Sequence, residues 1–204
     1  MVLVVGLLSG AGLLMLGARD GISGSAVAAS SATTPTTAGR STTPTITVKK
    51  PVPAGAKLSY TEYEGPWDFK WDKVELHTDW IEGRDHDTCA SIEKDGKLTA
   101  LGCKYAAEFV LSAESGGLRF TQFILAMPDA AIAKSAAAEF DQKALKPRSG
   151  TTIDNFATGK WKAGAQDEFV VVTLATATSA IDPGLVQKYL GYRHADIISA
   201  LLFR

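Results

Sequence analysis

The feature that most constrains this chain is the apolar run from Val2 to Ala18, which leads directly into a tract rich in Ser, Thr and Pro. The run has 17 residues and no charge before Arg19. That length lies at the lower limit for a helix that crosses a bilayer and above the usual core of a signal peptide. We therefore expect residues 1–27 to be a hydrophobic membrane anchor or a signal segment.

The two interpretations differ in what remains after maturation. The sequence Ala26-Val27-Ala28 has the small-x-small pattern of a cleavage site, but it lies well beyond the apolar run. An uncleaved anchor is therefore favoured, with secretion as the alternative. No basic flank precedes the run, so charge does not set its orientation. We expect a single-pass protein of the cell membrane whose C-terminal domain lies outside the cytoplasm.

The next segment, residues 28–56, contains almost nothing that a core could bury. From Ala28 to Thr47, 13 of the 20 residues are Ser, Thr or Pro. Such a composition cannot offset the entropy lost on ordering, which predicts a disordered, extended linker. It serves as a spacer or, alternatively, as a glycosylated stalk.

Residues 57–204 have the size of one folded domain. They contain 17 basic and 21 acidic residues, a formal charge of −4, which argues against a nucleic-acid partner. Nine of the carboxylates fall between Glu62 and Asp87. Because the spacing of a calcium-binding loop is absent there, a solvated acidic face is the simpler interpretation.

The only two cysteines, Cys89 and Cys103, lie close in sequence. Outside the cytoplasm such a pair predicts a disulfide bond. Between them Asp95-Gly96 supplies left-handed residues, which favours a tight hairpin turn. A rival interpretation uses His86 and both cysteines as metal ligands, with His77 as an optional fourth ligand, but the paired spacings of a structural zinc site are absent. We therefore expect no bound metal.

Apolar periodicity predicts an α+β fold for this domain. Two ββα units follow one another, and together they predict an antiparallel sheet of at least four strands with the helices packed on one face. The helices are expected to begin at Asp129 and Asp182, both typical N-cap residues. The expected strands lie near 104–111, 118–126, 157–163 and 169–175. The conformation of residues 197–203, helix or strand, is left open by the pattern.

Short motifs carry a resemblance to a group of bacterial proteins. They are Trp71-Asp72, Asp87-x-Cys89, Gly102-Cys103 and, near the C-terminus, Arg193-His194-Ala195-Asp196. Residues 67–204 resemble uncharacterised extracytoplasmic domains that follow one hydrophobic segment in actinobacterial single-pass envelope proteins. The resemblance implies no assigned reaction, cofactor or catalytic residue.

Catalytic patterns are weak throughout. No serine lies in a nucleophile-elbow sequence, and no glycine-rich loop joins a strand to a helix to hold phosphate. His194, Asp196 and Ser199 could be drawn as a triad, but helix residues two apart face different directions. We therefore predict no catalytic residues and no cofactor.

Aromatic residues gather in the acidic segment. Tyr63, Trp67 and Trp71 could form an exposed platform for a sugar ring or a partner protein. The alternative is that these side chains close the end of a small core. We expect a non-enzymatic module, attached to the membrane through its N-terminal segment, that binds an envelope protein or glycan. The alternatives are a small-molecule carrier or sensor with an apolar cavity and, third, a hydrolase.

Overall fold

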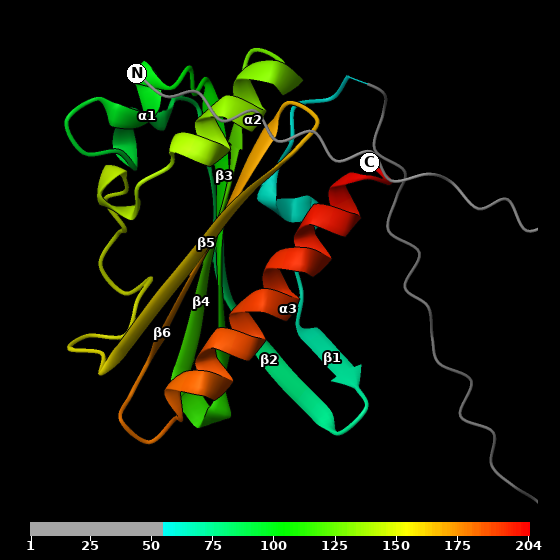
Figure 1. Cartoon of the computed structure of the whole chain (residues 1–204), viewed down its shortest axis with the longest axis vertical. Coiled ribbons are helices and arrows are strands. Elements are labelled where there is room, and N and C mark those ends of the chain that lie inside the picture. The colour runs from blue at the N-terminus through cyan, green and yellow to red at the C-terminus, as the bar shows by residue number, and fades with distance from the viewer. Residues whose placement is uncertain (1–54) are drawn as a thin grey trace, which may run out of the picture. The chain divides into compact units, whose positions relative to one another are not determined.

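Segments of alternating or continuous apolar residues between residues 67 and 177 form one curled antiparallel sheet of six strands (Figure 1). The structure, a computed structural model, describes residues 55–204. The predictions for the anchor or signal segment and for nearly all of the linker lie outside these residues. Within them, no helix is long and apolar enough to cross a bilayer.

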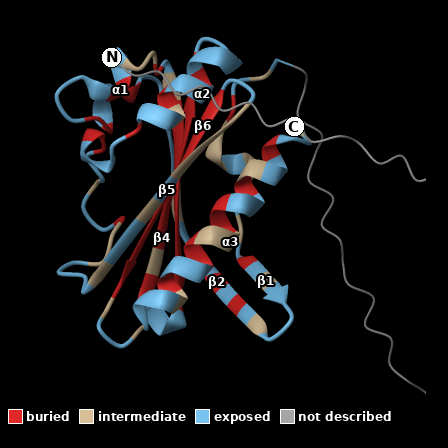
Figure 2. Cartoon of the chain, in the orientation of Figure 1, coloured by how far each residue is buried: buried red, intermediate tan, exposed pale blue. Residues whose placement is uncertain are grey.

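Three inner strands of the sheet, formed by residues 105–113, 118–126 and 169–177, are almost fully buried (Figure 2). Across the sheet the order is β1-β2-β3-β4-β6-β5, so β1 and β5 form the edges. All nine residues of β6 are buried, as its continuous apolar sequence predicted. The α+β class and the antiparallel sheet are thus confirmed, with six strands. The strands are β1 (Trp67–Trp71), β2 (Val74–His86), β3 (Tyr105–Ala113), β4 (Leu118–Ala126), β5 (Thr158–Gln166) and β6 (Phe169–Ala177).

The two longer helices, α2 (Ala130–Glu139) and α3 (Pro183–Leu201), lie on opposite faces of the sheet. Along β4, Phe123 packs with Ala136 of α2, whereas Phe120 packs with Leu190 of α3. The elements follow the order β3-β4-α2 and then β5-β6-α3, but the prediction that both helices share one face is wrong. Because β4 and β6 are apolar on both sides, each face of the sheet needs its own cover.

Both helices begin where the sequence predicted. The Asp129 carboxylate accepts a hydrogen bond from the backbone N–H of Ile132 at 2.8 Å, and that of Asp182 from Leu185 at 3.0 Å. In α2 the buried residues are Ala133 and Ala136, whereas Ile132 is 37% exposed. Helix α3 continues to Leu201, so residues 197–201 are helical.

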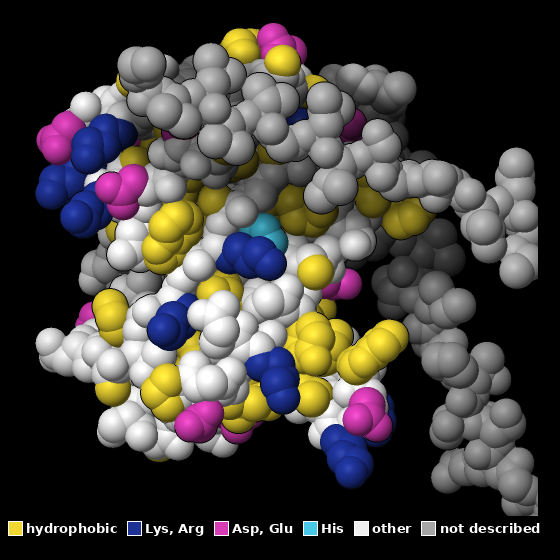
Figure 3. All heavy atoms as spheres, in the orientation of Figure 1, with side chains coloured by type: hydrophobic (Ala, Val, Ile, Leu, Met, Phe, Trp, Pro, Cys, Tyr) yellow, Lys and Arg dark blue, Asp and Glu magenta, His cyan; other side chains and the backbone are white. Residues whose placement is uncertain are grey.

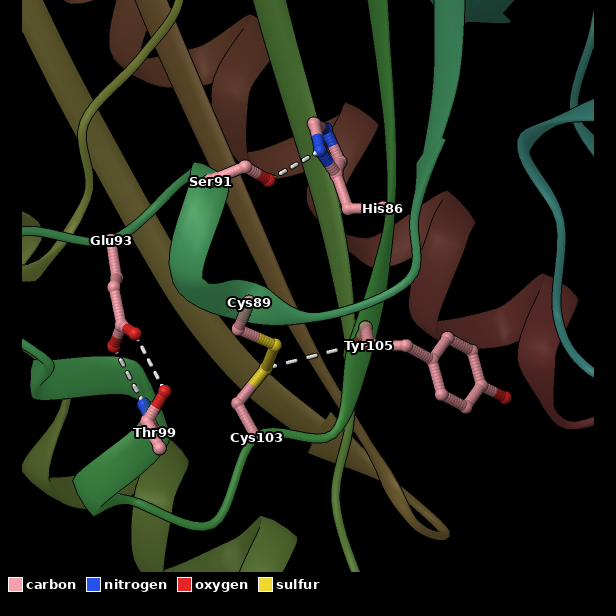
Figure 4. The surroundings of a disulfide bond; sticks show 7 residues. All are labelled: His86, Cys89, Ser91, Glu93, Thr99, Cys103 and Tyr105. Atoms are coloured by element: carbon pink, nitrogen blue, oxygen red, sulfur yellow. Dashed lines mark hydrogen bonds between the residues drawn. A yellow bond between two sulfur atoms is a disulfide. The ribbon is translucent and has the colours of Figure 1, made fainter.

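The segment between the cysteines folds as a loop with helical turns rather than as a hairpin. Asp95 and Gly96 have positive φ angles of 57° and 69°, as expected, but they lead into the short helix α1 (Lys97–Ala100). The predicted disulfide bond between Cys89 and Cys103 is confirmed, with the two Cα atoms 6.0 Å apart (Figure 4). Cys89 begins the short 3₁₀ turn η2 (Cys89–Ser91), so the bond ties this turn to the start of β3.

Strands β1 and β2, which form a hairpin, were not predicted from the sequence. The hairpin is acidic and aromatic, and only Trp67, Leu76, Thr78 and His86 of its residues are buried. β2 is long enough to pair with β3 along its second half, with a register shift between Trp80 and Glu82. This hairpin carries the segment on which the candidate site is built.

Candidate binding pocket

The three aromatic residues predicted as one exposed surface occupy different environments. Trp71 ends β1 at the hairpin and is 69% exposed, whereas Trp67 is only 8% exposed. Tyr63, just after the 3₁₀ turn η1 (Tyr60–Glu62), is half-buried and stacks on Phe109 with ring centroids 5.7 Å apart. The expectation of a single open platform is therefore wrong for Trp67, because the first residues of β1 lie beneath α3.

Trp67 is fixed by contacts on several sides. Its ring meets Phe120 edge-on at 6.1 Å and Phe69 at 5.6 Å. Its backbone N–H donates to the Thr78 hydroxyl at 3.0 Å, and that hydroxyl donates to the Trp67 carbonyl at 3.1 Å. Such a side chain is rigid, so any group that it presents to a ligand is held in place before binding.

Arg193 covers the other side of this ring. It lies in the buried stripe of α3 and is only 4% exposed. Its guanidinium carbon is 5.0 Å from the centroid of Trp67 and 5.5 Å from that of Phe109, within the range of cation–π attraction. A charged group therefore sits in a largely aromatic environment between α3 and β1.

Ionic pairing of Arg193 is incomplete. Its nearest carboxylate is that of Asp196, at 3.7 Å from Nη1, and Asp196 is more than half exposed. Within residues 55–204 its buried Nε has no hydrogen-bond partner. Burial lowers the pKa of Arg193 to about 10, opposed first by Asp196 and then by Tyr63. The positive charge is thus held in the interior with little compensation.

A pocket of about 170 Å³ is lined in part by Arg193. Its lining comes from the segment before β1 and from the last turns of α3. The segment contributes Tyr63, Pro66 and Trp67, and the helix contributes Arg193, Asp196, Ile197 and Ala200. Because sites for whole small molecules usually measure 300 Å³ or more, this pocket has room for one group of a larger partner.

A second buried charge belongs to Glu108 of β3. Within residues 55–204 its buried Oε1 has no hydrogen-bond partner, but its Oε2 has two close basic partners. Its Oε2 accepts hydrogen bonds from Arg148 Nε at 2.8 Å and from His86 Nε2 at 2.7 Å. Arg148 also donates to Glu82 at 3.1 Å. Burial tends to raise the pKa of Glu108, but the hydrogen bonds from His86 and Arg148 outweigh it and lower that pKa.

His86 also reaches a serine, which raises the question of catalysis. Its Nδ1 lies 2.8 Å from Ser91 Oγ, so Ser91, His86 and Glu108 form a chain of hydroxyl, imidazole and carboxylate (Figure 4 shows the first two). Acyl transfer also needs a substrate cleft and oxyanion donors at the nucleophile. The pockets described in residues 55–204 are not lined by Ser91. These hydrogen bonds connect η2 with β2, β3 and the loop that carries Arg148.

His194 does not join Asp196 and Ser199 in a triad. It is buried, and its Nδ1 lies 3.0 Å from the hydroxyl of Thr173, which in turn donates to Gln122 at 3.1 Å. Burial lowers the pKa of His194 to about 4, and the nearby Lys162 acts in the same direction. This histidine is a neutral member of the interface between α3 and the sheet.

The rival metal interpretation of the cysteines is wrong, because both sulfurs are in the disulfide bond. His86 is committed to Ser91 and Glu108 (Figure 4). Elsewhere in residues 55–204, no group of three or more His, Cys, Asp or Glu side chains is arranged to hold a metal ion.

Comparison with protein-family models, with curated proteins and with solved structures found no match for this chain. The resemblance to actinobacterial envelope domains therefore stays a prediction. What can be said of function depends on the geometry of the pocket itself.

Sequence reasoning placed Tyr63 and Trp67 at the site but did not assign Arg193 to it. A signal was present, because Leu190, Arg193 and Ile197 follow one another at helical spacing. A charged residue on the apolar stripe of a helix is either paired or functional. That pattern identifies Arg193 without a structure, although the aromatic partners beneath it do not follow from the sequence.

Proposed function

We propose that this chain is a membrane-anchored extracytoplasmic binding module that holds a partner at the pocket of Tyr63, Trp67 and Arg193. The single observation that supports this most strongly is the buried guanidinium of Arg193, which lines a pocket and has an incomplete set of partners. Proteins seldom retain a buried, poorly paired charge unless it has a task. The apolar run and the disulfide bond both support an address outside the cytoplasm.

The size of the pocket favours binding of one group of a larger partner over the transport of a free small molecule. The pocket volume of about 170 Å³ is too small to enclose a drug-sized ligand. The face shown in Figure 3 carries hydrophobic side chains in small patches among charged ones, where grey atoms do not cover it. The visible part of this face therefore gives little support for contact through a broad apolar surface.

Site-specific photo-crosslinking in the source cells tests the proposal. A photoreactive amino acid at Glu64, which is exposed and adjacent to the pocket lining, is compared with one at the exposed Lys143. We expect a discrete crosslinked envelope component at position 64, absent at position 143 and reduced by Arg193→Met. The same products at both positions, or products unaffected by Arg193→Met, would contradict a binding role for the pocket.

The proposed address has its own test. Full-length protein should enter the membrane fraction, resist carbonate extraction and expose its C-terminal domain to added protease. Recovery as an intact soluble cytoplasmic protein would contradict the proposed membrane anchor, but it would not bear on the proposed binding role of the pocket.

A further inference from the structure

We infer that the pocket binds the C-terminal carboxylate of a partner polypeptide whose last side chain is apolar. This inference rests on the proposed function and names the chemistry of the group that the pocket holds. It is argued from the charge, the walls and the volume of the site.

The charge of the pocket lining favours a ligand group with a single negative charge. A guanidinium presents five N–H donors in a planar fork that matches a carboxylate. Within residues 55–204, the one ion pair of Arg193 is the 3.7 Å contact to Asp196, and its Nε makes no hydrogen bond, although the guanidinium also lies over the rings of Trp67 and Phe109. The named lining holds one basic and one acidic side chain, so a dianion such as a phosphate monoester would lack a second cation. A monoanion is the better match.

The walls favour an apolar group beside that charge. Pro66 and Trp67 line one side of the pocket, and Ile197 and Ala200 line the other. A sugar ring normally stacks on an open aromatic face, but Trp67 is only 8% exposed and Arg193 covers it. The exposed ring of Trp71 is not part of the lining. A peptide end with an apolar last residue satisfies both the guanidinium and these walls.

Asp196 has a defined role in this arrangement. It lies one helical turn after Arg193 and is the nearest carboxylate to its guanidinium. Without a ligand it supplies a weak and exposed counter-charge. A bound carboxylate would displace this contact and would be repelled by Asp196, so removal of the Asp196 charge should strengthen binding of an anion and weaken binding of a cation.

Fluorescence anisotropy with full-length protein in detergent tests the inference. The probes are fluorescein-labelled pentapeptides with free carboxylates that end in Ala, Val, Leu or Phe, each compared with its C-terminal amide. We expect at least one free peptide to bind about tenfold to a hundredfold more tightly than its amide, the contribution of a charge-assisted hydrogen-bonded pair.

Variants separate the contributions of the two charges. Arg193→Met should remove the preference for the free carboxylate, and Arg193→Lys, which keeps the charge but not the fork, should weaken it. Asp196→Asn should tighten binding about two- to fivefold, the usual range for an exposed ion pair. Trp71→Ala, outside the lining, is the matched aromatic control and should leave binding unchanged.

Several outcomes of these binding measurements would contradict the inference. Equal affinity for peptide and amide, or weaker binding after Asp196→Asn, would overturn the inference. Failure of every peptide alongside an Arg193-dependent crosslink at position 64 would also overturn it, while leaving the binding module intact. Absence of both peptide binding and the Arg193-dependent crosslink would overturn the proposed function as well.

Discussion

Arg148 and Arg193 both contact buried groups of this domain, and their surroundings differ sharply. Arg148 donates to the fully buried Glu108 and also to Glu82, at distances of 2.8 and 3.1 Å. Arg193 is more deeply buried, yet its nearest carboxylate is 3.7 Å away and exposed. The first arginine compensates a charge that the fold has already buried. The second brings a charge into an aromatic environment that compensates it poorly.

This difference indicates what each arginine is for. Removal of one partner from a buried ion pair leaves an uncompensated charge and costs several kcal/mol. Replacement of Arg193 by an apolar group of similar volume leaves no buried charge behind, because its nearest carboxylate, Asp196, is exposed. Arg148 therefore belongs to the scaffold, whereas the fold retains Arg193 for a reason other than its own stability.

The largest expected effect is that of Arg148→Met. The variant leaves Glu108 buried with only His86 beside it, and we expect the free energy of unfolding to fall by about 3–5 kcal/mol. Urea unfolding at pH 7 measures it. Glu108→Gln should restore part of the loss in the Arg148→Met background, because it removes the orphaned charge. A loss below about 1 kcal/mol would show that the two arginines do not differ as proposed.

The next prediction compares the effects on stability of replacing Trp67 and Trp71. Trp67→Ala deletes a buried ring and the support of Arg193, so it should cost about 3–5 kcal/mol of stability. Trp71→Ala, at an exposed position, should change stability by no more than about 0.5 kcal/mol. Thermal unfolding of both variants measures the contrast. Similar melting temperatures for the two would mean that Trp67 is not a core residue.

A smaller effect concerns pH and His194. Its pKa in the folded state is about 4, below the ordinary value of 6.5, so the unfolded chain binds more protons between these pH values. Stability should therefore decrease by about 1–3 kcal/mol as the pH falls from 6.5 to 4. His194→Gln should flatten this part of the profile of unfolding free energy against pH. An identical slope in both proteins would show that another group titrates there.

Much of the architecture followed from local patterns. The strands near 118–126 and 169–175 and the N-caps Asp129 and Asp182 were predicted because apolar periodicity and capping chemistry are encoded within a few residues. The prediction that both helices lie on one face was wrong, because their placement depends on which strand faces remain uncovered. The hairpin of β1 and β2 was missed, although Val74, Leu76, Thr78 and Trp80 alternate with polar residues as in a half-buried strand.

The candidate site shows the same division. Tyr63 and Trp67 stood out by their aromatic character, but whether each was exposed depended on the position of α3, more than a hundred residues away in sequence. Arg193 was marked by its place on an apolar stripe. Its contact with the ring of Trp67 is a tertiary feature that no local pattern contains.

The most direct test is Arg193→Met, measured for both stability and binding in the same preparation. We predict that the free energy of unfolding in urea changes by no more than about 1 kcal/mol or increases, because methionine fills similar space without a buried charge. Binding of the free-carboxylate peptides, and the crosslink at position 64, should be lost. A destabilisation comparable to that of Arg148→Met, with peptide binding retained, would contradict the assignment of Arg193 to a binding site.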